Sequence, residues 1–556
     1  MAVRSIIVGL LTPLALLAAC GFSPTGNAPP ARLIAPLSTA TVNVARPTLR
    51  FTLPAGGTQP IVELSRKRGF DAELRRATVD GSRTHATPDG DLEPGLWFWR
   101  VRVSTPNGPS TSPVWQLTRT AQPGAREASW GSALDVDGDG FAELAVGASD
   151  TTIDGNIGTG RVYVYAGGPD GPDLARVTVL DGPVAGGQFG HSLAAVDFDG
   201  DGFADLAVGA SSEGTAGTGI SGKVYVYRGG PHGLAAAPDY TLSTGDGGGV
   251  GWSLDGAGDL NGDGYGDLVA GAPLSKVAGV LTGAAYVFYG DDHGGANVAT
   301  LRTSDGALAK VGLAVAGGGD LDGDGLADVI IGVPDSPMGS AGHGRAYIYR
   351  GQPIGLDDNP TVLDESSPLL AQFGSALAIA GDVDGDGLAD LAVSAPGDGA
   401  GRVYLYTGRA GAAPQKLARF DGPDGPDGRF GATLSSDDVD GDGRSDLAIG
   451  ATCAPPGPDC PGRAYVVLAA SATFDPMGST SVSATFTGPA ASSAYGISLQ
   501  LADHDGDGRA DLAVGASAFQ FGLGRVDWFH GGPTFDPTPR ALNGVDAKSR
   551  YGVSLR

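Results

Sequence analysis

The sequence predicts an all-β protein, a seven-bladed β-propeller preceded by a small β-sandwich. Three observations lead to this prediction. An acidic pattern, D-x-[DN]-x-D-G-x-x-[DE], occurs seven times along the chain. Its copies begin about 60 residues apart, a period typical of arrays of supersecondary units. Segments that alternate aromatic and β-branched residues follow the copies, and no stretch shows a helical pattern that could compete with strands.

The acidic pattern has the composition of a loop that wraps a hard cation. Oxygen-bearing side chains stand at positions 1, 3, 5 and 9, and glycine at position 6 permits a sharp turn. The backbone carbonyl at position 7 adds a fifth oxygen. This mostly anionic oxygen set favours calcium over magnesium or zinc, so we predict up to seven calcium ions. The predicted ligands are Asp135, Asp137, Asp139, Phe141, Glu143, Asp197, Asp199, Asp201, Phe203, Asp205, Asp259, Asn261, Asp263, Tyr265, Asp267, Asp320, Asp322, Asp324, Leu326, Asp328, Asp382, Asp384, Asp386, Leu388, Asp390, Asp438, Asp440, Asp442, Arg444, Asp446, Asp503, Asp505, Asp507, Arg509 and Asp511.

Two other interpretations of the pattern compete with calcium binding. A single D-G-D-G stretch is more often a solvated turn. Seven copies of it, however, would each crowd carboxylates that repel by roughly 3 to 4 kcal/mol per pair at an effective dielectric of about 20. A helix-flanked calcium loop needs an acidic residue at position 12, where this chain has only Val, Ala or Ile, as at Val208 and Ala270. The cation is therefore expected in a turn between two strands.

Each copy lies in a repeat with four expected strands. An aromatic or apolar residue followed by glycine, as in Phe189-Gly190, leads the first strand, and the metal loop follows it. The second strand ends in Gly-Ala-Ser or Gly-Ala-Pro, as at Gly271-Ala272-Pro273. Residues 224–227 and 240–242 illustrate the third and fourth strands. Four short antiparallel strands make one blade, and closing seven blades into a ring protects most sheet edges.

These signatures resemble FG-GAP repeats, the units of the integrin α-subunit β-propeller, over about residues 120 to 556. The chain differs from that family in carrying a metal loop in every repeat. It also lacks the leg domains that follow an integrin propeller, so the resemblance gives no reason to expect an integrin β-subunit partner. The segment Tyr551-Gly552-Val553-Ser554-Leu555 looks like another first strand. We expect it to close the ring, and a truncated eighth repeat is the alternative.

The first 31 residues are expected to direct and anchor the protein. Residues 1–19 carry Arg4 and then an apolar stretch too short to span a bilayer, as in a secretory signal peptide. Leu17-Ala18-Ala19-Cys20 resembles a bacterial lipobox, which would make Cys20 the lipidated first residue of the mature chain. Gly21 after it resembles an outer-membrane signal of Gram-negative lipoproteins. Residues 20–31 are expected to be a flexible tether. The alternative is a secreted soluble protein in which Cys20 has no such role.

Residues 32–119 differ in sequence pattern from the repeats and contain no metal loop. Strands are expected at residues 50–53 and 96–103, and about 90 residues of this kind suit a small β-sandwich. The run Leu92-Glu93-Pro94-Gly95, followed by the second of these strands and by Asn107-Gly108, resembles a fibronectin type III domain.

Charge and cysteines restrict the function further. A net charge of −26 argues against nucleic acid as a partner, because phosphates would be repelled. Cys453 and Cys460 lie close in sequence and are predicted to form a disulfide in an oxidising compartment. A zinc site there would need two further ligands, and the neighbouring sequence offers none.

The search for catalytic residues leads to the expectation that the protein is not an enzyme. The seven histidines are scattered. His504, at position 2 of a metal loop, is expected to point outward, and His232 and His530 are expected in solvated hairpin turns. FG-GAP repeats also accompany a phospholipase, but its catalytic domain is separate. We therefore expect a calcium-stabilised, lipid-anchored envelope protein that binds a protein or glycan at the cell surface. The alternatives are a structural scaffold of an envelope complex and a hydrolase with its site in the propeller channel.

Overall fold

A computed structural model describes residues 31–119 and 133–556. Within these ranges it leaves out residues 37–39, 43, 55, 68, 72–73, 82, 107, 113, 215–220, 246, 278, 292–296, 337–342, 366–369, 426–427, 453–459, 470–473, 479–481, 536–537 and 547. The predicted signal peptide, Cys20, the tether up to residue 30 and Cys453 lie outside the described residues, so the lipid anchor and the Cys453–Cys460 pairing stay predictions. Ala31, the last residue of the predicted tether, is buried in the core of the N-terminal unit. In the described part of the chain, no helix has the length and apolar character needed to cross a membrane.

The N-terminal unit consists of nine strands in one hydrogen-bonded sheet, with the order β1-β3-β6-β5-β4-β7-β9-β2 and with β8 paired to β7. The strands are β1 (Arg32–Ala35), β2 (Ala40–Val42), β3 (Leu49–Thr52), β4 (Thr58–Ser65), β5 (Arg75–Val79), β6 (His85–Pro88), β7 (Gly95–Thr105), β8 (Gly108–Thr111) and β9 (Trp115–Arg119). The alternating side chains Trp97, Trp99, Val101 and Val103 of β7 are all buried. Because such alternation sends one face of a strand inward, these residues build the core of the unit with Trp115, whose ring lies edge-on to Trp99 at 6.0 Å. Both strands expected here from the sequence are present, and the fibronectin type III resemblance stays a prediction.

Residues 144–543 form seven consecutive antiparallel sheets among the described residues, which we number as the first to seventh blades. The first blade contains β10 (Leu144–Ala148), β11 (Arg161–Tyr165) and β12 (Val177–Asp181). The second contains β13 (Phe189–Val196), β14 (Asp205–Ala210), β15 (Lys223–Tyr227) and β16 (Tyr240–Leu242), and the third β17 (Ser253–Gly258), β18 (Asp267–Ala272), β21 (Ala284–Phe288) and β22 (Val298–Leu301). The fourth contains β23 (Val315–Gly319), β24 (Asp328–Val333), β25 (Arg345–Tyr349) and β28 (Thr361–Leu363), and the fifth β29 (Leu377–Gly381), β30 (Asp390–Ala395), β31 (Arg402–Thr407) and β32 (Gln415–Asp421). The sixth contains β33 (Phe430–Asp437), β34 (Asp446–Ala451), β35 (Arg463–Val467) and β36 (Ala484–Thr487), and the seventh β37 (Tyr495–Ala502), β38 (Asp511–Ala516), β39 (Arg525–Phe529) and β40 (Arg540–Asn543).

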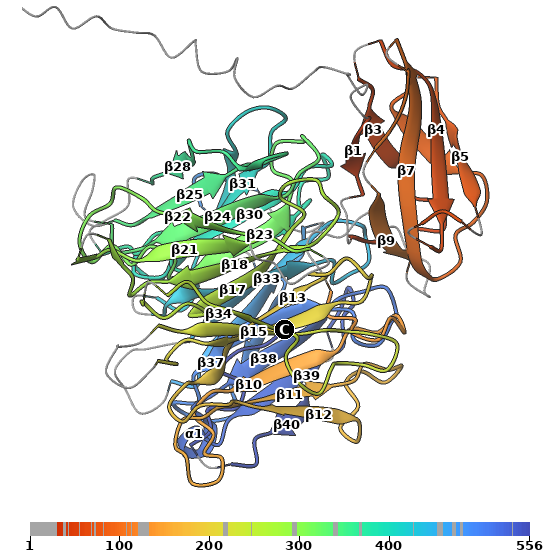
Figure 1. The fold of residues 1–556 in the computed structure, drawn as a ribbon. Helices are drawn as coiled ribbons and strands as arrows, with labels where there is room; N and C mark the ends of the chain where they lie inside the picture. Colours follow the sequence, from red (N-terminus) through yellow and green to blue (C-terminus); the bar gives the residue numbers. More distant parts are fainter. Residues whose placement is uncertain are drawn as a thin grey trace, which may run out of the picture.

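Shorter elements decorate the loops of these blades. Two-residue hairpins are formed by β19 (Lys276–Val277) with β20 (Val280–Leu281), and by β26 (Gly351–Gln352) with β27 (Gly355–Leu356). A single turn, α1 (Phe519–Gly522), is the helical element of the described residues. Figure 1 shows the N-terminal unit at one side of the larger body formed by the blades. The predictions of an all-β fold and a propeller are confirmed.

The Phe-Gly and Gly-Ala signatures meet at the contact between neighbouring blades. A Cβ atom on Gly209, in the second strand of its blade, would lie 2.2 Å from the carbonyl oxygen of Gly251, in the Val-Gly pair of the next blade. The hydroxyl of Ser192 donates a hydrogen bond of 2.7 Å to the same carbonyl. The same close approach joins Gly271 to Gly312 and Gly450 to Gly496. Glycine is therefore required in the second strand because the next backbone fills the place of a side chain.

The C-terminal segment completes the first blade. The backbone N–H of Gly147 in β10 donates to the carbonyl of Ser554 at 2.9 Å, and Ala145 and Arg556 exchange backbone hydrogen bonds in both directions. On the other side, Arg540 of β40 donates to the carbonyl of Asp170 in the first blade at 2.8 Å. Residues 551–556 thus occupy the first-strand position of the first blade, as expected for a closing strand and not for a separate eighth repeat.

Candidate functional site

All seven acidic loops share one hydrogen-bonding pattern, although their sequences differ at several positions. The first carboxylate of each loop accepts a hydrogen bond from the N–H of the position-6 glycine, at 2.7–3.1 Å. That glycine has φ between 86° and 96° in every loop. Such a left-handed conformation disfavours residues with a Cβ, which explains why glycine stands at position 6. The loops are consequently turns that fold back on their own first residue.

The position-9 carboxylate joins each loop to the body of its blade. One of its oxygens accepts a hydrogen bond from the position-2 N–H at 2.8–3.1 Å in all seven loops. In the second to seventh blades the other oxygen accepts a backbone N–H just after the third strand, at 2.7–3.0 Å. Asp205, Asp267, Asp390 and Asp511 at this position are fully buried. Each loop therefore packs on a buried position-9 carboxylate that backbone hydrogen bonds hold in place.

The folded chain brings carboxylates of the predicted sets close together. Ligand atoms of Asp197, Asp199 and Asp205 lie within 4.8 Å of one another, and the loops that begin at Asp135, Asp320 and Asp382 contain similar groups. Oxygen atoms at this separation converge on a volume that a single cation could share. The donor chemistry therefore fits the predicted calcium ions, with hard oxygen ligands in an irregular cage.

Burial and mutual repulsion make these carboxylates difficult to ionise without a cation. Burial raises the pKa of Asp135 to about 7, and the neighbouring Asp139 contributes to the rise. Burial also raises the pKa of Glu143 to about 9 and that of Asp503 to about 8, again with nearby carboxylates adding to the effect. Asp267 has a pKa well above the usual value, from burial first and from Asp259 second. A bound dication would remove this penalty by offsetting the negative charge.

Some loops already contain a cationic side chain of the protein. Arg228 forms an ion pair with Asp199 in the second blade, and Arg350 lies 3.1 Å from Asp322 in the fourth. In the fifth blade the neutral hydroxyl of Thr407 donates to Asp384 at 2.8 Å. The loops are thus alike in backbone geometry but unlike in charge.

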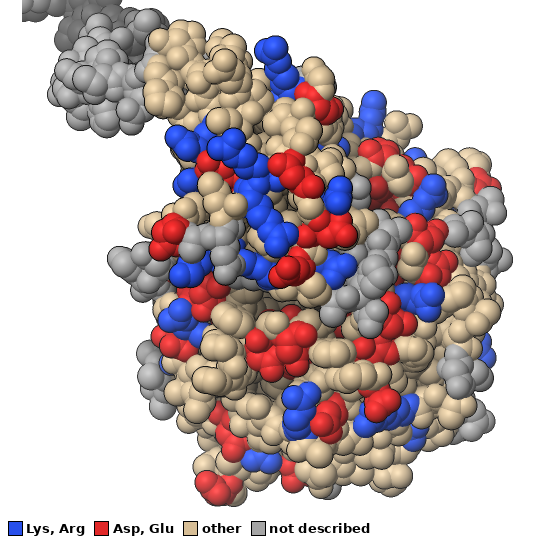
Figure 2. Space-filling model, turned by 90° about the vertical axis from the view of Figure 1, so that its right-hand side faces the viewer, with Lys and Arg blue, Asp and Glu red and all other residues tan. Residues whose placement is uncertain are grey.

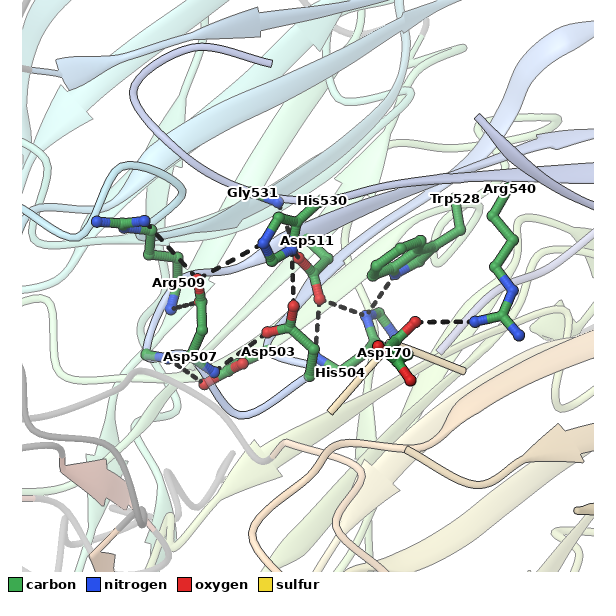
Figure 3. Close-up of polar contacts among 12 residues, drawn as sticks. Asp170, Asp503, His504, Asp507, Arg509, Asp511, Trp528, His530, Gly531 and Arg540 are labelled. Carbon is green, nitrogen blue, oxygen red and sulfur yellow. Dashed lines mark hydrogen bonds and ion pairs between the residues drawn. The ribbon is translucent and has the colours of Figure 1, made fainter. Parts of the chain in front are cut away.

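The seventh blade departs furthest from the sequence-based expectation (Figure 3). His530 is not confined to a solvated turn, because its Nδ1 lies 2.7 Å from Asp505 and 3.2 Å from Asp511. Its hydrogen bond with Asp511 raises the pKa of His530 to about 9. His504 does not point outward, since its side chain is fully buried and its Nδ1 accepts a hydrogen bond from Trp528 at 3.4 Å.

A sequence signal for both histidines was available in the alignment of the repeats. The residues that align with His504 at position 2 are apolar and buried: Val136, Phe198, Leu260, Leu321, Val383 and Val439. His530 aligns with Arg228 and Arg350, which also contact their loops. The structure therefore adds His530 to the predicted site residues of the seventh loop.

A hollow of about 610 Å³ lies between the N-terminal unit and the ring. It is lined by Arg50 and Arg409, by Asp386 and Leu388 of the fifth metal loop, and by Gly323 of the fourth. The Arg50 guanidinium donates to the carbonyl of Gly387 at 3.2 Å, so the two units meet directly here. Figure 2 shows acidic and basic side chains interspersed over the face in view.

Comparison with known families identifies the repeats. A model described as an FG-GAP repeat matches residues 128–165, 189–227, 250–288, 311–349 and 373–406. A second model, described as an FG-GAP-like repeat, matches residues 438–514. The chain contains FG-GAP repeats. The matched segments coincide with the metal loops and with the strands around them.

Relatives of this FG-GAP protein include integrin α subunits and an enzyme. It is 29% identical to integrin alpha-5 of Xenopus laevis over 313 residues, which cover 51% of the chain and 28% of the integrin. It is 38% identical over 169 residues to phosphatidylinositol-glycan-specific phospholipase D of Bos taurus, covering 28% of the chain and 20% of the phospholipase. The alignments thus span less than a third of either relative.

Among solved structures, the FG-GAP protein is similar to the Dos1 propeller, with 10% identity, a TM-score of 0.33, and coverage of 76% of this chain and 91% of that one. The rhamnogalacturonan lyase YesW matches with 14% identity and a TM-score of 0.28, covering 91% and 69%.

The expectation that the protein is not an enzyme is contradicted by these comparisons. It rested on the scattered histidines and on the separate catalytic domain of the phospholipase that carries such repeats. The phospholipase D relatives overturn it, because a match at 38% identity places an enzyme among the homologues of this chain.

Proposed function

We propose that this FG-GAP protein is a calcium-stabilised, lipid-anchored binding or adhesion protein of the cell envelope, in the outer membrane of a Gram-negative bacterium. The observation that carries the proposal is the shared geometry of the seven loops. Each places a buried position-9 carboxylate beneath a ring of further oxygen ligands, and seven dications would offset much of the net charge of −26. Calcium then holds the loops rigid, and the ring presents its opposite face to a ligand.

The opposite face follows from the order of strands within a blade. The metal loop leads into the second strand, and the connection to the third strand leaves the far end of that same strand. These connections differ between blades, from residues 396–401 in the fifth blade to residues 211–222 in the second and 334–344 in the fourth. Parts of the two longer connections lie outside the described residues. Variable loops on a rigid scaffold are a common way to build a recognition surface.

Exchange of these connections tests the proposal. Residues 211–222 and 334–344 would each be replaced by the short 396–401 connection, which leaves the metal loops intact. The purified proteins, in calcium, would be applied to arrays of surface glycans and extracellular proteins. We expect the native chain to bind a defined ligand and the exchanged chain to lose it. Equal binding by both would refute a ligand face, and co-purification of both with one envelope complex would favour a structural scaffold.

A second candidate function is enzymatic, and the phospholipase D relatives favour it. In this case the substrate would bind in the hollow beside Arg50 and Arg409 or in the propeller channel. Assays of the purified chain on phosphatidylinositol-glycan, simple esters and glycans test it. Turnover that disappears when Arg409 is replaced by alanine would support this candidate.

A further inference from the structure

In the second, fourth, fifth and seventh blades, one equivalent side chain contacts the metal loop. It belongs to the residue that ends the third strand or follows it, immediately before the backbone N–H that donates to the position-9 carboxylate. That donor is Gly229 in the second blade, at 2.9 Å from Asp205, and Gly531 in the seventh, at 2.8 Å from Asp511. By this criterion, and by repeat alignment in the first blade, the equivalent residues are Ala166, Arg228, Tyr289, Arg350, Thr407, Leu468 and His530. We call this position the loop-adjacent residue.

The side chain of the loop-adjacent residue differs between blades in its ability to bind a metal ion. Arg228 and Arg350 each pair with the position-3 aspartate of their own loop. A guanidinium can supply positive charge but has no lone pair to give to a metal. Imidazole can do both, because a neutral ring offers one nitrogen as a ligand. His530 is therefore the loop-adjacent residue that can add a nitrogen ligand to an otherwise all-oxygen loop.

His530 lies where such a ligand is needed. Its Nδ1 lies 2.7 Å from Asp505 and 3.2 Å from Asp511, and its Nε2 lies 3.8 Å from Asp507. Asp505 is 9% exposed and Asp511 is fully buried, while the imidazole side chain is half exposed. One ligand atom from each of Asp505, Asp511 and His530 falls within 4.8 Å of the others. Figure 3 shows His530 beside the carboxylate of Asp511.

A second observation concerns the position-1 aspartate of the same loop. In the other six loops, the Oδ1 atom of the position-1 aspartate accepts a backbone N–H from within the loop. In the seventh loop the corresponding Oδ1 of Asp503 is buried and has no hydrogen-bond partner. Leaving a buried carboxylate oxygen without a partner is costly, and a cation bound in the loop would remove that cost.

We propose that the seventh loop binds a first-row transition-metal dication, such as zinc, through His530 and the carboxylates of Asp505 and Asp511. Asp503 supplies a further oxygen. Imidazole nitrogen with carboxylate oxygen is a donor set typical of zinc and its neighbours, whereas calcium takes oxygen ligands alone. The inference goes beyond the calcium role of the other loops and does not depend on it. The alternative is that His530, like Arg228, serves only as an internal counter-ion.

Metal retention distinguishes these alternatives. The full chain, without a histidine tag, would be stripped of metal, equilibrated with zinc in the presence of excess calcium, and dialysed against calcium alone before elemental analysis. We expect one zinc ion per chain for the native protein and at least about a tenfold loss of zinc affinity for His530→Ala. His232→Ala, which removes an exposed histidine in the turn of the second blade, is the matched control and should retain zinc.

Zinc-edge X-ray absorption gives a readout that a purely structural role would not change. The native protein should show one imidazole nitrogen in the zinc shell, and the His530→Ala variant should lose that signal while melting as the native protein does in calcium. Native protein that retains no zinc against calcium would overturn the proposal. Zinc retained equally by His530→Ala, or a zinc shell of oxygen alone, would also overturn it.

Discussion

Val146 and Leu555 are paired as antiparallel neighbours although almost the whole ring separates them in sequence. Val146 lies in the second strand of the first blade, and Leu555 is the second-to-last residue. Both belong to one buried cluster that also contains Ala513 and Trp528 of the seventh blade. The Ser554 hydroxyl donates to the carbonyl of Gly190 at 2.8 Å, as Ser192 does to Gly251 one blade later. The chain end thus repeats the ordinary contact between blades and closes the ring.

The first prediction concerns this closure. Leu555 is 8% exposed, so Leu555→Asp would bury a charge in an apolar cluster and should lower the free energy of unfolding by about 3 kcal/mol or more. Ile354→Asp is the matched control, because Ile354 is 94% exposed and its change should cost less than about 0.5 kcal/mol. Thermal and urea unfolding midpoints measure both. Equal midpoints for the two variants would contradict the closing role of the C-terminal segment.

The second prediction concerns calcium removal. Ions bound by the folded state alone stabilise it by about 2.7 kcal/mol per site at a hundredfold excess over the dissociation constant. Excess EGTA should therefore lower the melting temperature substantially, and calcium should restore it. Magnesium at the same concentration should restore less, because it dehydrates reluctantly and demands a stricter geometry. An unchanged melting curve in EGTA, measured by calorimetry on exhaustively dialysed protein, would count against calcium loops.

The repeat made most of this architecture predictable, because strands, glycines and acidic loop follow one another in the same order in the sequence of each blade. The expected third strand at residues 224–227 differs from β15 by one residue, and the closing strand at Tyr551 to Leu555 was expected too. Such features are local or are imposed by the period. Backbone contacts such as that between Gly209 and Gly251 explain why the signatures recur.

The side-chain contents of individual loops were harder to predict. His530 reaches Asp505 from a different strand, and the distance between them depends on how the third strand ends. The sequence predicts that His504 points outward, whereas the fold turns position 2 toward the interior. Comparison among the copies, where Phe198 and Leu260 occupy that position, carries the correct signal. Enzymatic relatives, in turn, cannot be recognised from the number of histidines in this chain.

The third prediction separates metal binding from structural hydrogen bonding in the third blade. Asp267 accepts backbone N–H groups from Leu260 and Gly290, both at 2.9 Å. Asp267→Asn presents an amide N–H to one of these donors and should cost about 1–3 kcal/mol even without calcium. Asp263→Asn, at an exposed position of the same loop, should destabilise the protein only when calcium is present. Melting temperatures of both variants in calcium and in EGTA check this. Identical behaviour of the two would contradict separate roles.

The fourth prediction concerns the anchor. Cys20→Ser removes the predicted lipid attachment point, so the variant should move from the membrane fraction to the soluble fraction when cells are lysed. Cys460→Ser is the control, because it alters the predicted disulfide but leaves Cys20 in place, and should stay with the membranes. Fractionation followed by immunoblotting gives the distribution. A Cys20→Ser variant that remains in the membrane fraction would refute lipid anchoring through this residue.

The last prediction concerns the pH dependence of the metal-free protein. Burial raises the pKa of Asp259, Asp390 and Asp446 to about 7 in the folded chain, against 3.8 for an ordinary aspartate. The folded state therefore binds more protons than the unfolded state between these values, and its stability falls as pH rises from about 4 through about 7. Metal-free protein should melt at a higher temperature at pH 5 than at pH 8, and saturating calcium should reduce or reverse that difference, since it binds the ionised form. Calorimetry of chelate-stripped protein at pH 5 and pH 8 measures the two melting temperatures. A metal-free form that is more stable at pH 8 would contradict the crowding of buried carboxylates.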